Sequence, residues 1–335
     1  MTDTTRETGP REPITVLSVM GAGRSGTTVL ASILNEIDGF ASAGELRWLW
    51  DRGVVQERPC GCGEVPARCP VWSPVVAHTV GSGGDRPPEE VVQEIVAAQR
   101  EVSRGRNRWR VLGSAGGAHR DWAALQRVRA AMGAACVAFA RTTGQRVVVD
   151  TSKRAEDAAV LAAVDGVDHY VLHIVRDPRA VVHSWRRAKT FTAGGSSRTM
   201  GTRGMPGTVR RWIENSLGAE VLLRQLPPTR WLRVRYEDFS RDPRGVVDQV
   251  LELLGAHGQA PFENDDTVLL HPNHIVAGNP SRFTTGSVRI RLDEEWRTGM
   301  RRRDQRLVAL FTWPLMLRYG YLGSAQASCH RETVP

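Results

Sequence analysis

The clearest pattern along the chain is a set of four short apolar runs, rich in β-branched residues, that each end in charged or small polar residues. They occupy 14–20 (ITVLSVM), 146–152 (RVVVDTS), 169–177 (HYVLHIVRD) and 231–238 (WLRVRYED). Near-continuous apolar runs separated by helical stretches predict an α/β fold, a three-layer sandwich whose central parallel sheet is flanked by helices. Ligands of such sheets bind beyond the carboxyl ends of the strands, so the polar residues at those ends are the first candidates for chemistry.

Composition divides the chain into a tail and one large unit. Residues 1–12 are polar and predict a flexible N-terminal tail, whereas 13–325 predict a single domain, because a chain of this length can bury one sizeable core. Amphipathic patterns between the first two apolar runs predict a helical insertion at about 50–140. A stretch rich in Gly, Ser, Thr and Arg predicts a mobile loop at about 188–210.

The chain is basic, with 45 Lys and Arg against 36 Asp and Glu and a net charge of +9. Such a balance suits an anionic ligand without identifying it. The basic run 300–306 (MRRRDQR) lacks interleaved aromatic residues and a known nucleic-acid-binding motif, so we expect a solvated helix face and no nucleic-acid partner. Only two of the basic residues, Lys153 and Lys189, are lysines, which is typical of a high-GC bacterial genome and draws attention to the compact ammonium of Lys153.

Cysteine content and hydropathy favour a cytoplasmic protein. Five cysteines are too few for a disulfide scaffold in 335 residues, and the N-terminal residues lack the basic and then apolar pattern of a signal peptide. The apolar stretch that begins at 307 (LVALFTWPLMLRYGYL) is too short, and too interrupted by Pro314 and Arg318, to span a bilayer. It predicts a packed C-terminal helix.

Three cysteines, Cys60, Cys62 and Cys69, lie close together in the sequence, with His78 further on. Three thiols and a histidine can ligate zinc, but the usual C-x-x-C spacing is absent. We therefore interpret these cysteines as bracing the insertion and expect no metal. The sequence leaves open whether they are free, paired or metal-bound.

A glycine-rich turn follows the first apolar run. Residues 21–28 (GAGRSGTT) match the phosphate-binding pattern G-x-x-x-x-G-K-[ST] at both glycines and at the final hydroxyl residue, whereas Thr27 stands in the lysine position. N–H groups at the start of the following helix still point at an anion, together with the positive end of the helix dipole. The missing lysine is the one that reaches the β and γ phosphates in nucleoside triphosphate enzymes, and Arg24 supplies a charge within the turn.

Two further motifs follow, 175–185 (VRDPRAVVHSW) and 233–243 (RVRYEDFSRDP). With 23–30 (GRSGTTVL) they stand in the order found in the sulfotransferases that use 3′-phosphoadenosine-5′-phosphosulfate (PAPS), and the chain resembles that family. The segment 278–286 (GNPSRFTTG) extends the resemblance over most of the chain. The resemblance implies a P-loop-type fold and the transfer of a sulfuryl group from PAPS to a hydroxyl acceptor, without a metal.

The resemblance also implies which residues hold the donor. By resemblance, Arg176 and Ser184 bind the 3′-phosphate, since a guanidinium can bind a phosphate through two hydrogen bonds. Arg282 is a further basic contact to the same phosphate, later in the chain. Tyr236 stands where the family places an aromatic residue near the adenine. Without the resemblance, Arg176 would form a strand-end ion pair with Asp177 or another carboxylate, and Tyr236 would be a core residue. By the same resemblance, the glycine-rich turn binds the 5′-phosphosulfate, through Gly23, Arg24, Ser25, Gly26, Thr27 and Thr28.

In its catalytic residues the chain is similar to the tyrosylprotein sulfotransferases, whose base is a Glu in a Gly-Glu context after the glycine-rich turn. Glu45 follows Gly44 here, so the resemblance implies that Glu45 takes the proton of the acceptor hydroxyl. Lys153 is in a position resembling the catalytic lysine of those enzymes, and Asp150 is a candidate to orient it. Arg24 and Lys153 would neutralise charge on the transferring group and on the leaving phosphate.

Several alternatives stay open at this level. If Glu45 is not the base, His183, His173 and His274 come next, although His173 lies within an apolar run. A P-loop kinase and a non-enzymatic nucleotide-binding regulator are the competing functions, and Thr27 in the lysine position argues against the kinase. The acceptor is open among small molecules, glycans and glycolipids, and so is the oligomeric state.

Overall fold

The computed structural model describes residues 13–81, 84–187, 189–193 and 196–322. The predicted tail at 1–12 and the end of the predicted domain at 323–325 lie outside the described residues.

Strands and helices alternate from the start of the described chain. The first half contains β1 (Ile14–Gly21), α1 (Thr27–Leu34), β2 (Phe40–Gly44), α2 (Trp72–Gly81), α3 (Pro88–Val102), α4 (Arg108–Leu112), α5 (Ala123–Thr143), β3 (Val147–Lys153), α6 (Ala155–Ala162), β4 (Val167–Val175) and α7 (Pro178–Arg186). The second half contains β5 (Lys189–Ala193), β6 (Ser196–Met200), α8 (Met205–Leu223), β7 (Trp231–Arg235), α9 (Tyr236–Arg241), α10 (Pro243–Leu254), β8 (Thr267–Leu270), β9 (Gly286–Arg289), α11 (Trp296–Gly299) and α12 (Arg302–Arg318). Short 3₁₀ or π turns cover Leu46–Trp48, Leu49–Val55, Gly105–Asn107, Pro228–Arg230 and Pro280–Phe283.

The central sheet has five strands in the order β2-β3-β1-β4-β7, and each neighbouring pair is parallel. This confirms the predicted α/β fold, and the four predicted strands correspond to β1, β3, β4 and β7. The apolar pattern does not reveal β2, because its sequence FASAG contains no β-branched residue. β2 lies at the edge of the sheet and pairs only with β3 within it.

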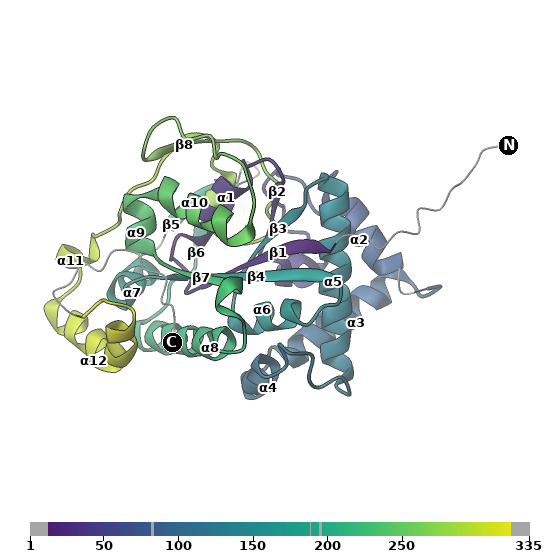
Figure 1. Cartoon of the computed structure of the whole chain (residues 1–335), viewed down its shortest axis with the longest axis horizontal. Coiled ribbons are helices and arrows are strands. Elements are labelled where there is room, and N and C mark those ends of the chain that lie inside the picture. The colour runs from purple at the N-terminus through teal and green to yellow at the C-terminus, as the bar shows by residue number, and fades with distance from the viewer. Residues whose placement is uncertain (1–12, 82–83, 188, 194–195, 323–335) are drawn as a thin grey trace.

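Side chains alternate between the two faces of the sheet, as strand geometry requires. Val16 and Val148 pack in the core that α2, α3 and α5 cover, whereas Leu17 and Val149 pack in the core that α1 and α10 cover. Figure 1 shows α1, α9 and α10 on one side of the strands and α6 and α8 on the other. The predicted sandwich of helices, sheet and helices is therefore confirmed.

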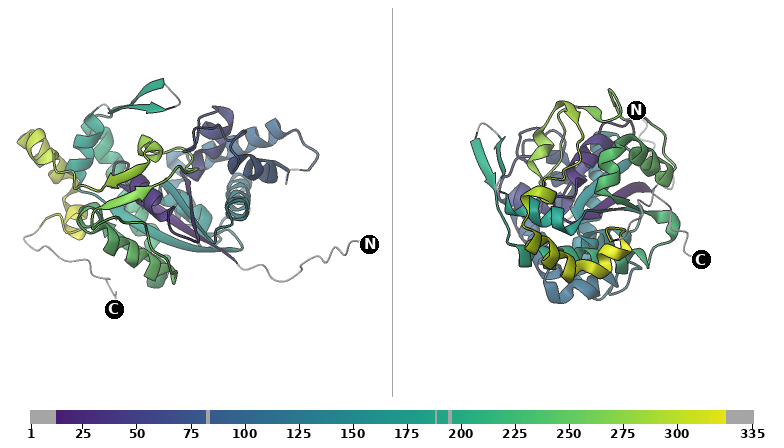
Figure 2. Two further views of the ribbon diagram at one scale, coloured as in Figure 1. Left: turned by 90° about the horizontal axis from the view of Figure 1, so that it is seen from above. Right: turned by 90° about the vertical axis from the view of Figure 1, so that its left-hand side faces the viewer.

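The elements outside the sheet lie where the composition suggested insertions. α2 to α5 all come between β2 and β3, within the predicted helical insertion. Within the stretch 188–210, predicted as a mobile loop, β5 and β6 form an antiparallel hairpin and α8 begins. This hairpin stands out from the body of the molecule in the left view of Figure 2.

The predicted C-terminal helix is α12, which contains Pro314 and buries Val308, Thr312 and Met316 on one side. Across the described part of the chain, every helix falls short of the length and apolar character that a bilayer crossing requires.

Candidate active site

Residues 22–28 comprise the turn between β1 and α1 and the first two residues of α1, and we call them the cradle. Gly26, directly before α1, has a φ of 79°, a left-handed conformation that glycine adopts without strain. The first N–H groups of a helix lack partners within it, so those of Thr27 and Thr28 are available where the helix dipole favours an anion. Arg24, which is not a glycine, also has a left-handed φ of 76°. Such backbone strain is concentrated at functional sites.

Two side chains of the cradle carry buried polar atoms that have no hydrogen-bond partner among the described residues. These atoms are the three guanidinium nitrogens of Arg24 and the hydroxyl oxygen of Ser25. The Arg24 guanidinium lies over the ring of Trp185, 5.0 Å from the centroid. Burial lowers the pKa of Arg24, and the nearby cations Arg187 and Arg176 lower it further. Buried donors and gathered positive charge are both costly without a counter-ion, so the cradle suits an anionic ligand.

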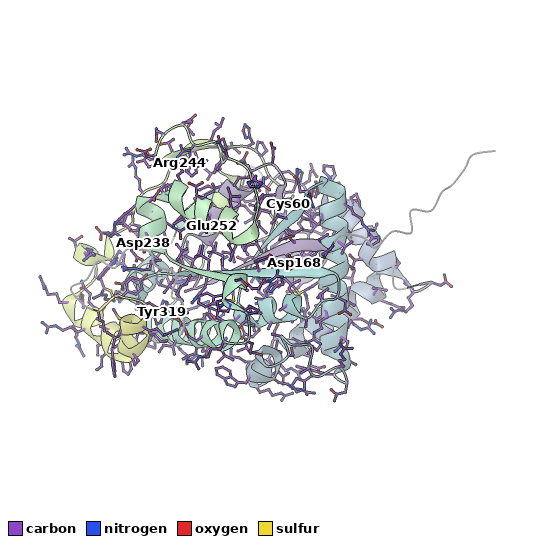
Figure 3. The ribbon with its side chains drawn as sticks, in the orientation of Figure 1. Cys60, Asp168, Asp238, Arg244, Glu252 and Tyr319 are labelled. Atoms are coloured by element: carbon purple, nitrogen blue, oxygen red, sulfur yellow. The ribbon has the colours of Figure 1, made fainter. Side chains whose placement is uncertain are left out.

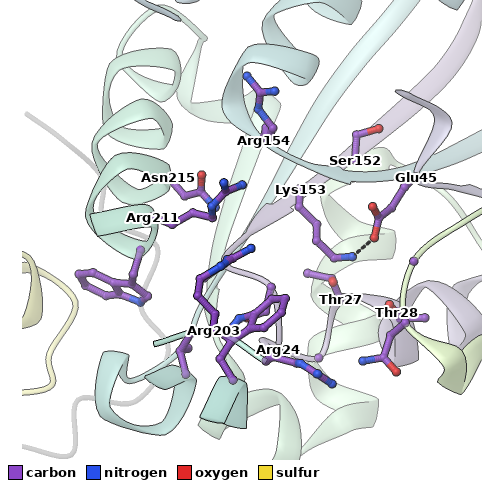
Figure 4. A pocket seen from close by; sticks show the side chains of 18 of the residues that line it. Arg24, Thr27, Thr28, Glu45, Ser152, Lys153, Arg154, Arg203, Arg211 and Asn215 are labelled. Carbon is purple, nitrogen blue, oxygen red and sulfur yellow. Dashed lines mark hydrogen bonds and ion pairs between the residues drawn. The ribbon is translucent and has the colours of Figure 1, made fainter. Parts of the chain in front are cut away.

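Glu45 and Lys153 form an ion pair at the edge of the cradle, although 108 residues separate them in sequence. Their side chains are only 12% and 16% exposed. Glu45 directly follows β2 and Lys153 ends β3, so the carboxyl ends of two neighbouring strands bring the groups together. Lys153 has a left-handed φ of 71°. Figure 4 shows the pair beside Thr27 and Thr28, at the place where sheets of this kind bind ligands.

Backbone contacts fix the position of Glu45. Its N–H donates to the Val276 carbonyl at 2.9 Å, and Gly44 forms a parallel bridge with the same residue. Gly44 has a φ of 79°, and a Cβ at this position would lie 2.4 Å from the Val276 oxygen. Only glycine satisfies both conditions. The Gly-Glu pair recognised in the sequence therefore has a physical reason, which is the close approach of the chain at 275–278 to the end of β2.

Asp150 positions the backbone on either side of this ion pair. Its Oδ1 accepts hydrogen bonds from the Leu46 N–H at 3.2 Å, from the Ser152 N–H at 3.2 Å and from the Ser152 hydroxyl at 2.6 Å. Burial raises the pKa of Asp150 to about 7, against the effect of the bonds from Ser152. Leu46 and Ser152 are the neighbours of Glu45 and Lys153, so Asp150 acts on the pair through the chain.

The cradle, with the exception of Ser25, and the ion pair line a cavity of about 310 Å³. Figure 4 shows Arg203, Arg211 and Asn215 on the side of Lys153 opposite Glu45. Further polar and aromatic residues that no sequence motif indicated complete the lining, and they include Arg47, Trp48, Arg52, Arg154, Arg203, Arg211 and Asn215.

A local signal existed for some of these residues. Arg47, Trp48 and Arg52 directly follow Glu45 in the run ELRWLWDR, and the Arg52 guanidinium stacks on the Trp48 ring at 3.6 Å from its centroid. Arg211 and Asn215 are four residues apart on α8 and so share one face of that helix. No pattern in the sequence says that this face turns toward Lys153.

Arg176 and Tyr236 pack against the cradle. The Arg176 guanidinium donates to the Arg24 carbonyl at 2.6 Å, pairs with the Asp293 carboxylate at 3.1 Å and lies 4.1 Å from the centroid of the Tyr236 ring. The ring of Tyr236 in turn lies against Gly26, where an added Cβ would come within 2.9 Å of it. Arg176 thus makes the carboxylate pair that its strand-end position suggests, and the partner is Asp293.

These residues, with Ser184, do not line the cavity. Ser184 is buried on α7. The assignments of Arg176 and Ser184 to a 3′-phosphate, and of Tyr236 to an adenine, remain predictions.

Arg282 contacts the backbone of the loop before α2. Its guanidinium donates to the Gly278 carbonyl at 3.1 Å and to the Pro59 carbonyl at 3.3 Å. These bonds join two segments far apart in sequence, and a contact of Arg282 with a 3′-phosphate stays a prediction.

The three histidines named as alternative bases also do not line the cavity. His173 is buried in β4, where Arg233 donates to its ring at 3.4 Å, and burial with that neighbouring charge lowers its pKa well below the ordinary value. The Nδ1 of His274 lies 3.2 Å from the sulfur of Cys69. His183 is on α7. Among the candidate bases, Glu45 is the one that lines the cavity.

The fold and the site define an α/β protein in which a glycine-rich cradle without the usual lysine adjoins a carboxylate–ammonium pair. Comparison with known proteins gives the family. A model described as "Sulfotransferase family" matches residues 17–259. The chain belongs to the sulfotransferase family.

Individual relatives are distant. Mouse carbohydrate sulfotransferase 5 is 27% identical over 138 residues, which make up 38% of this chain and 35% of that protein, so the chain matches about a third of the length of this curated relative. Among solved structures, the sulfotransferase domain of the Synechococcus PCC 7002 olefin synthase is 18% identical, with a TM-score of 0.48 and coverage of 91% of this chain and 96% of that one. A sulfotransferase from Mycobacterium avium is 14% identical, with a TM-score of 0.39 and coverage of 74% and 65%.

Proposed function

We propose that the protein transfers a sulfuryl group from PAPS to a hydroxyl of a small-molecule, glycan or glycolipid acceptor, with Glu45 as the general base. The observation that carries the proposal is the Glu45–Lys153 ion pair at the edge of a cradle whose Arg24 and Ser25 side chains have unpartnered buried polar atoms.

The cradle fits the 5′-phosphosulfate of PAPS. The unpartnered guanidinium of Arg24, the hydroxyl of Ser25 and the N–H groups at the start of α1 are all donors, which is what a phosphosulfate accepts from. Thr27 takes the place of the lysine that kinases use for a γ-phosphate, and PAPS has no γ-phosphate. These features favour PAPS over a nucleoside triphosphate.

When bound, PAPS supplies the sulfuryl group and the departing adenosine 3′,5′-bisphosphate. The Glu45 carboxylate would accept the proton of the acceptor hydroxyl. Lys153 and Arg24 would stabilise the negative charge that develops between acceptor and donor, because fixed cations in a sheltered site need no reorganisation during the reaction. Gly44, Asp150 and the Val276 carbonyl hold these groups in place before substrate arrives.

The lining of the cavity away from the cradle supports a polar acceptor. Arg52 stacked on Trp48, together with Arg211 and Asn215, offers an aromatic surface and hydrogen-bond donors, a combination that suits a hydroxyl-rich molecule. The name of the distant mouse relative, a carbohydrate sulfotransferase, agrees with a glycan among the candidates.

Calorimetric titration tests the donor. We expect adenosine 3′,5′-bisphosphate to bind in the micromolar range and ATP with magnesium to bind far more weakly, at one fixed salt concentration. A preference for ATP would refute the assignment of PAPS as the donor and would favour the alternative function, a P-loop kinase.

A substitution tests the base. Glu45→Gln keeps the shape of the side chain but cannot take a proton, so turnover of PAPS with a panel of phenols, glycosides and glycolipids should fall by about 100-fold or more. Affinity for the bisphosphate should be nearly unchanged. Glu89→Gln, at an exposed position in the first turn of α3, is the matched control and should keep full turnover. Undiminished turnover in Glu45→Gln would exclude Glu45 as the base.

A further inference from the structure

Three cysteines and one histidine meet outside the cavity. Cys60, Cys62 and Cys69 precede α2, and His274 follows β8, yet one possible ligand atom from each lies within 4.8 Å of all the others. We call these four residues the cysteine–histidine cluster; Figure 3 labels Cys60 within it. The histidine is His274, not the His78 that the sequence suggested. None of the four residues lines the 310 Å³ cavity, so the cluster is separate from the candidate active site.

The distances within the cluster resemble those of a tetrahedral metal site. The sulfur of Cys69 lies 3.7 Å from that of Cys60 and 3.8 Å from that of Cys62. Zinc bonds of about 2.3 Å to sulfur and about 2.0 Å to nitrogen give tetrahedral edges of roughly 3.8 Å between sulfurs and roughly 3.5 Å from sulfur to nitrogen. Two other edges, 3.1 Å between Cys60 and Cys62 and 3.2 Å from Cys69 to the His274 Nδ1, are somewhat shorter. The last two edges, from His274 to Cys60 and to Cys62, are no longer than 4.8 Å.

The backbone is arranged to bring the two segments together. A Cβ at Gly61 would lie 2.0 Å from the side-chain oxygen of Asn273 and 2.7 Å from its carbonyl, so only glycine fits between the first two cysteines. The Gly61 N–H donates to the Ile275 carbonyl at 3.0 Å. This close approach places the thiols of Cys60 and Cys62 beside residues 273–275, which we call the histidine segment. A loop that only braced the insertion would not need so close an approach.

Neighbouring groups orient the ligands. The indole N–H of Trp72 donates to the His274 carbonyl at 2.6 Å, and the Trp72 backbone N–H points at the sulfur of Cys69 at 3.5 Å. Backbone N–H groups directed at ligand sulfurs, and fixed ligand segments, are the outer-shell contacts that structural metal sites use.

We propose that Cys60, Cys62, Cys69 and the Nδ1 of His274 bind one structural zinc ion. Four protein ligands complete the tetrahedral shell and leave no position for a substrate, which is the mark of a structural site. On binding, the three thiols release their protons to solvent, and no oxidant or reductant takes part. The proposal revises the expectation of no metal, which rested on the absence of a C-x-x-C pair. It stands independently of the proposed transfer reaction.

The zinc would hold the chain that supports Glu45. His274 is two residues before Val276, whose carbonyl accepts the Glu45 N–H at 2.9 Å and whose N–H donates to the Ala43 carbonyl at 3.0 Å. Losing the ion would free the histidine segment from the loop before α2 and loosen this backbone pairing. The consequence is a loss of stability as well as of activity.

Metal analysis of the untagged protein, grown with added zinc and dialysed in metal-free buffer, tests the site. We expect one zinc ion per chain by plasma mass spectrometry, and its loss in Cys69→Ser and His274→Ala. Cys136→Ser is the matched control, because Cys136 is buried in α5 outside the cluster, and it should keep its zinc. Zinc-free wild-type protein, iron in place of zinc, or zinc kept by both cluster variants would overturn the proposal.

Two measurements on the wild type cover the case in which the variants fail to fold. Removal of zinc with a strong chelator should lower the midpoint of thermal unfolding, and restored zinc should return it. Cobalt in its place should give the intense visible absorption of a tetrahedral thiolate site. An unchanged midpoint after complete removal would refute a structural role, and an intact mass that shows a disulfide among the cluster cysteines would refute the site.

Discussion

The substitution Gly44→Ala isolates the structural requirement that places Glu45. Gly44 ends β2 with a φ of 79°, and an added Cβ would lie 2.4 Å from the Val276 oxygen, 2.7 Å from Ile275 Cγ2 and 2.8 Å from the Val276 nitrogen. Two of these three atoms belong to the backbone, so a change of side-chain rotamer cannot relieve the overlap.

The expected cost has two parts. A left-handed backbone costs a non-glycine residue about 1–2 kcal/mol. Overpacking against neighbours that must shift adds about 1–3 kcal/mol. Together they predict that the free energy of unfolding of Gly44→Ala falls by about 2–5 kcal/mol. The chain at 275–276 must move away, and with it the carbonyl that accepts the Glu45 N–H.

Gly39→Ala is the matched control. Gly39 directly precedes β2 and has a φ of 89°, but a Cβ there would have no atom within 4 Å, so this variant pays only the backbone cost. Denaturant unfolding of both variants and the wild type measures the difference, and sulfuryl transfer measures the effect on turnover. The reasoning is refuted if Gly44→Ala is no less stable than Gly39→Ala.

Three further predictions concern charges around the site. Asp293→Asn removes the carboxylate that pairs with Arg176, so binding of adenosine 3′,5′-bisphosphate should tighten if Arg176 holds the 3′-phosphate; calorimetry showing no change would leave Arg176 a purely structural role. Arg24→Ala should weaken the same binding by about 10- to 100-fold, the worth of one charge-assisted hydrogen bond or more, and equal affinity would contradict the cradle assignment. Burial raises the pKa of Asp150 to about 7 in the folded protein, whereas its pKa in the unfolded chain is about 4. Protonation of Asp150 therefore contributes its full stabilisation of the folded state below about pH 4, and this contribution is lost as the pH rises toward 7. Denaturant unfolding should therefore show Asp150→Asn gaining stability relative to the wild type between pH 5 and pH 8, and a constant difference would refute the shifted pKa.

The sequence predicts β1, β3 and β4 because these strands bury residues on both faces and so appear as apolar runs, whereas only Val234 is buried in the shorter run of β7. β2 escapes detection for a physical reason. Its small residues FASAG contribute little apolar surface, and it is held by backbone pairing to β3 along one edge. The hairpin of β5 and β6 escapes as well, because residues rich in Gly, Ser and Thr are equally typical of a loop.

The chemistry of the site could be predicted only in part. The glycine-rich turn is contiguous in sequence, so its pattern alone indicates an anion cradle. The Glu45–Lys153 pair joins residues 108 apart, and family resemblance rather than spacing suggested it. The cysteine–histidine cluster joins residues 205 apart, and no local pattern links Cys69 to His274.

The segment 274–282 connects the ion pair, the cradle and the cysteine–histidine cluster, and it lies beyond residues 17–259 that the family model matches. The Val276 carbonyl accepts a hydrogen bond from the Glu45 N–H. The backbone at Gly278 also lies close to the site, because a Cβ added there would be 3.4 Å from the Glu45 carboxylate and 3.8 Å from the Thr28 hydroxyl. His274 belongs to the same segment, which also donates through Arg282 to the loop before α2. The position of the candidate base therefore depends on residues outside the matched region. Zinc binding at one end of this segment would therefore help to fix the position of Glu45 without any contact between the metal and the substrate.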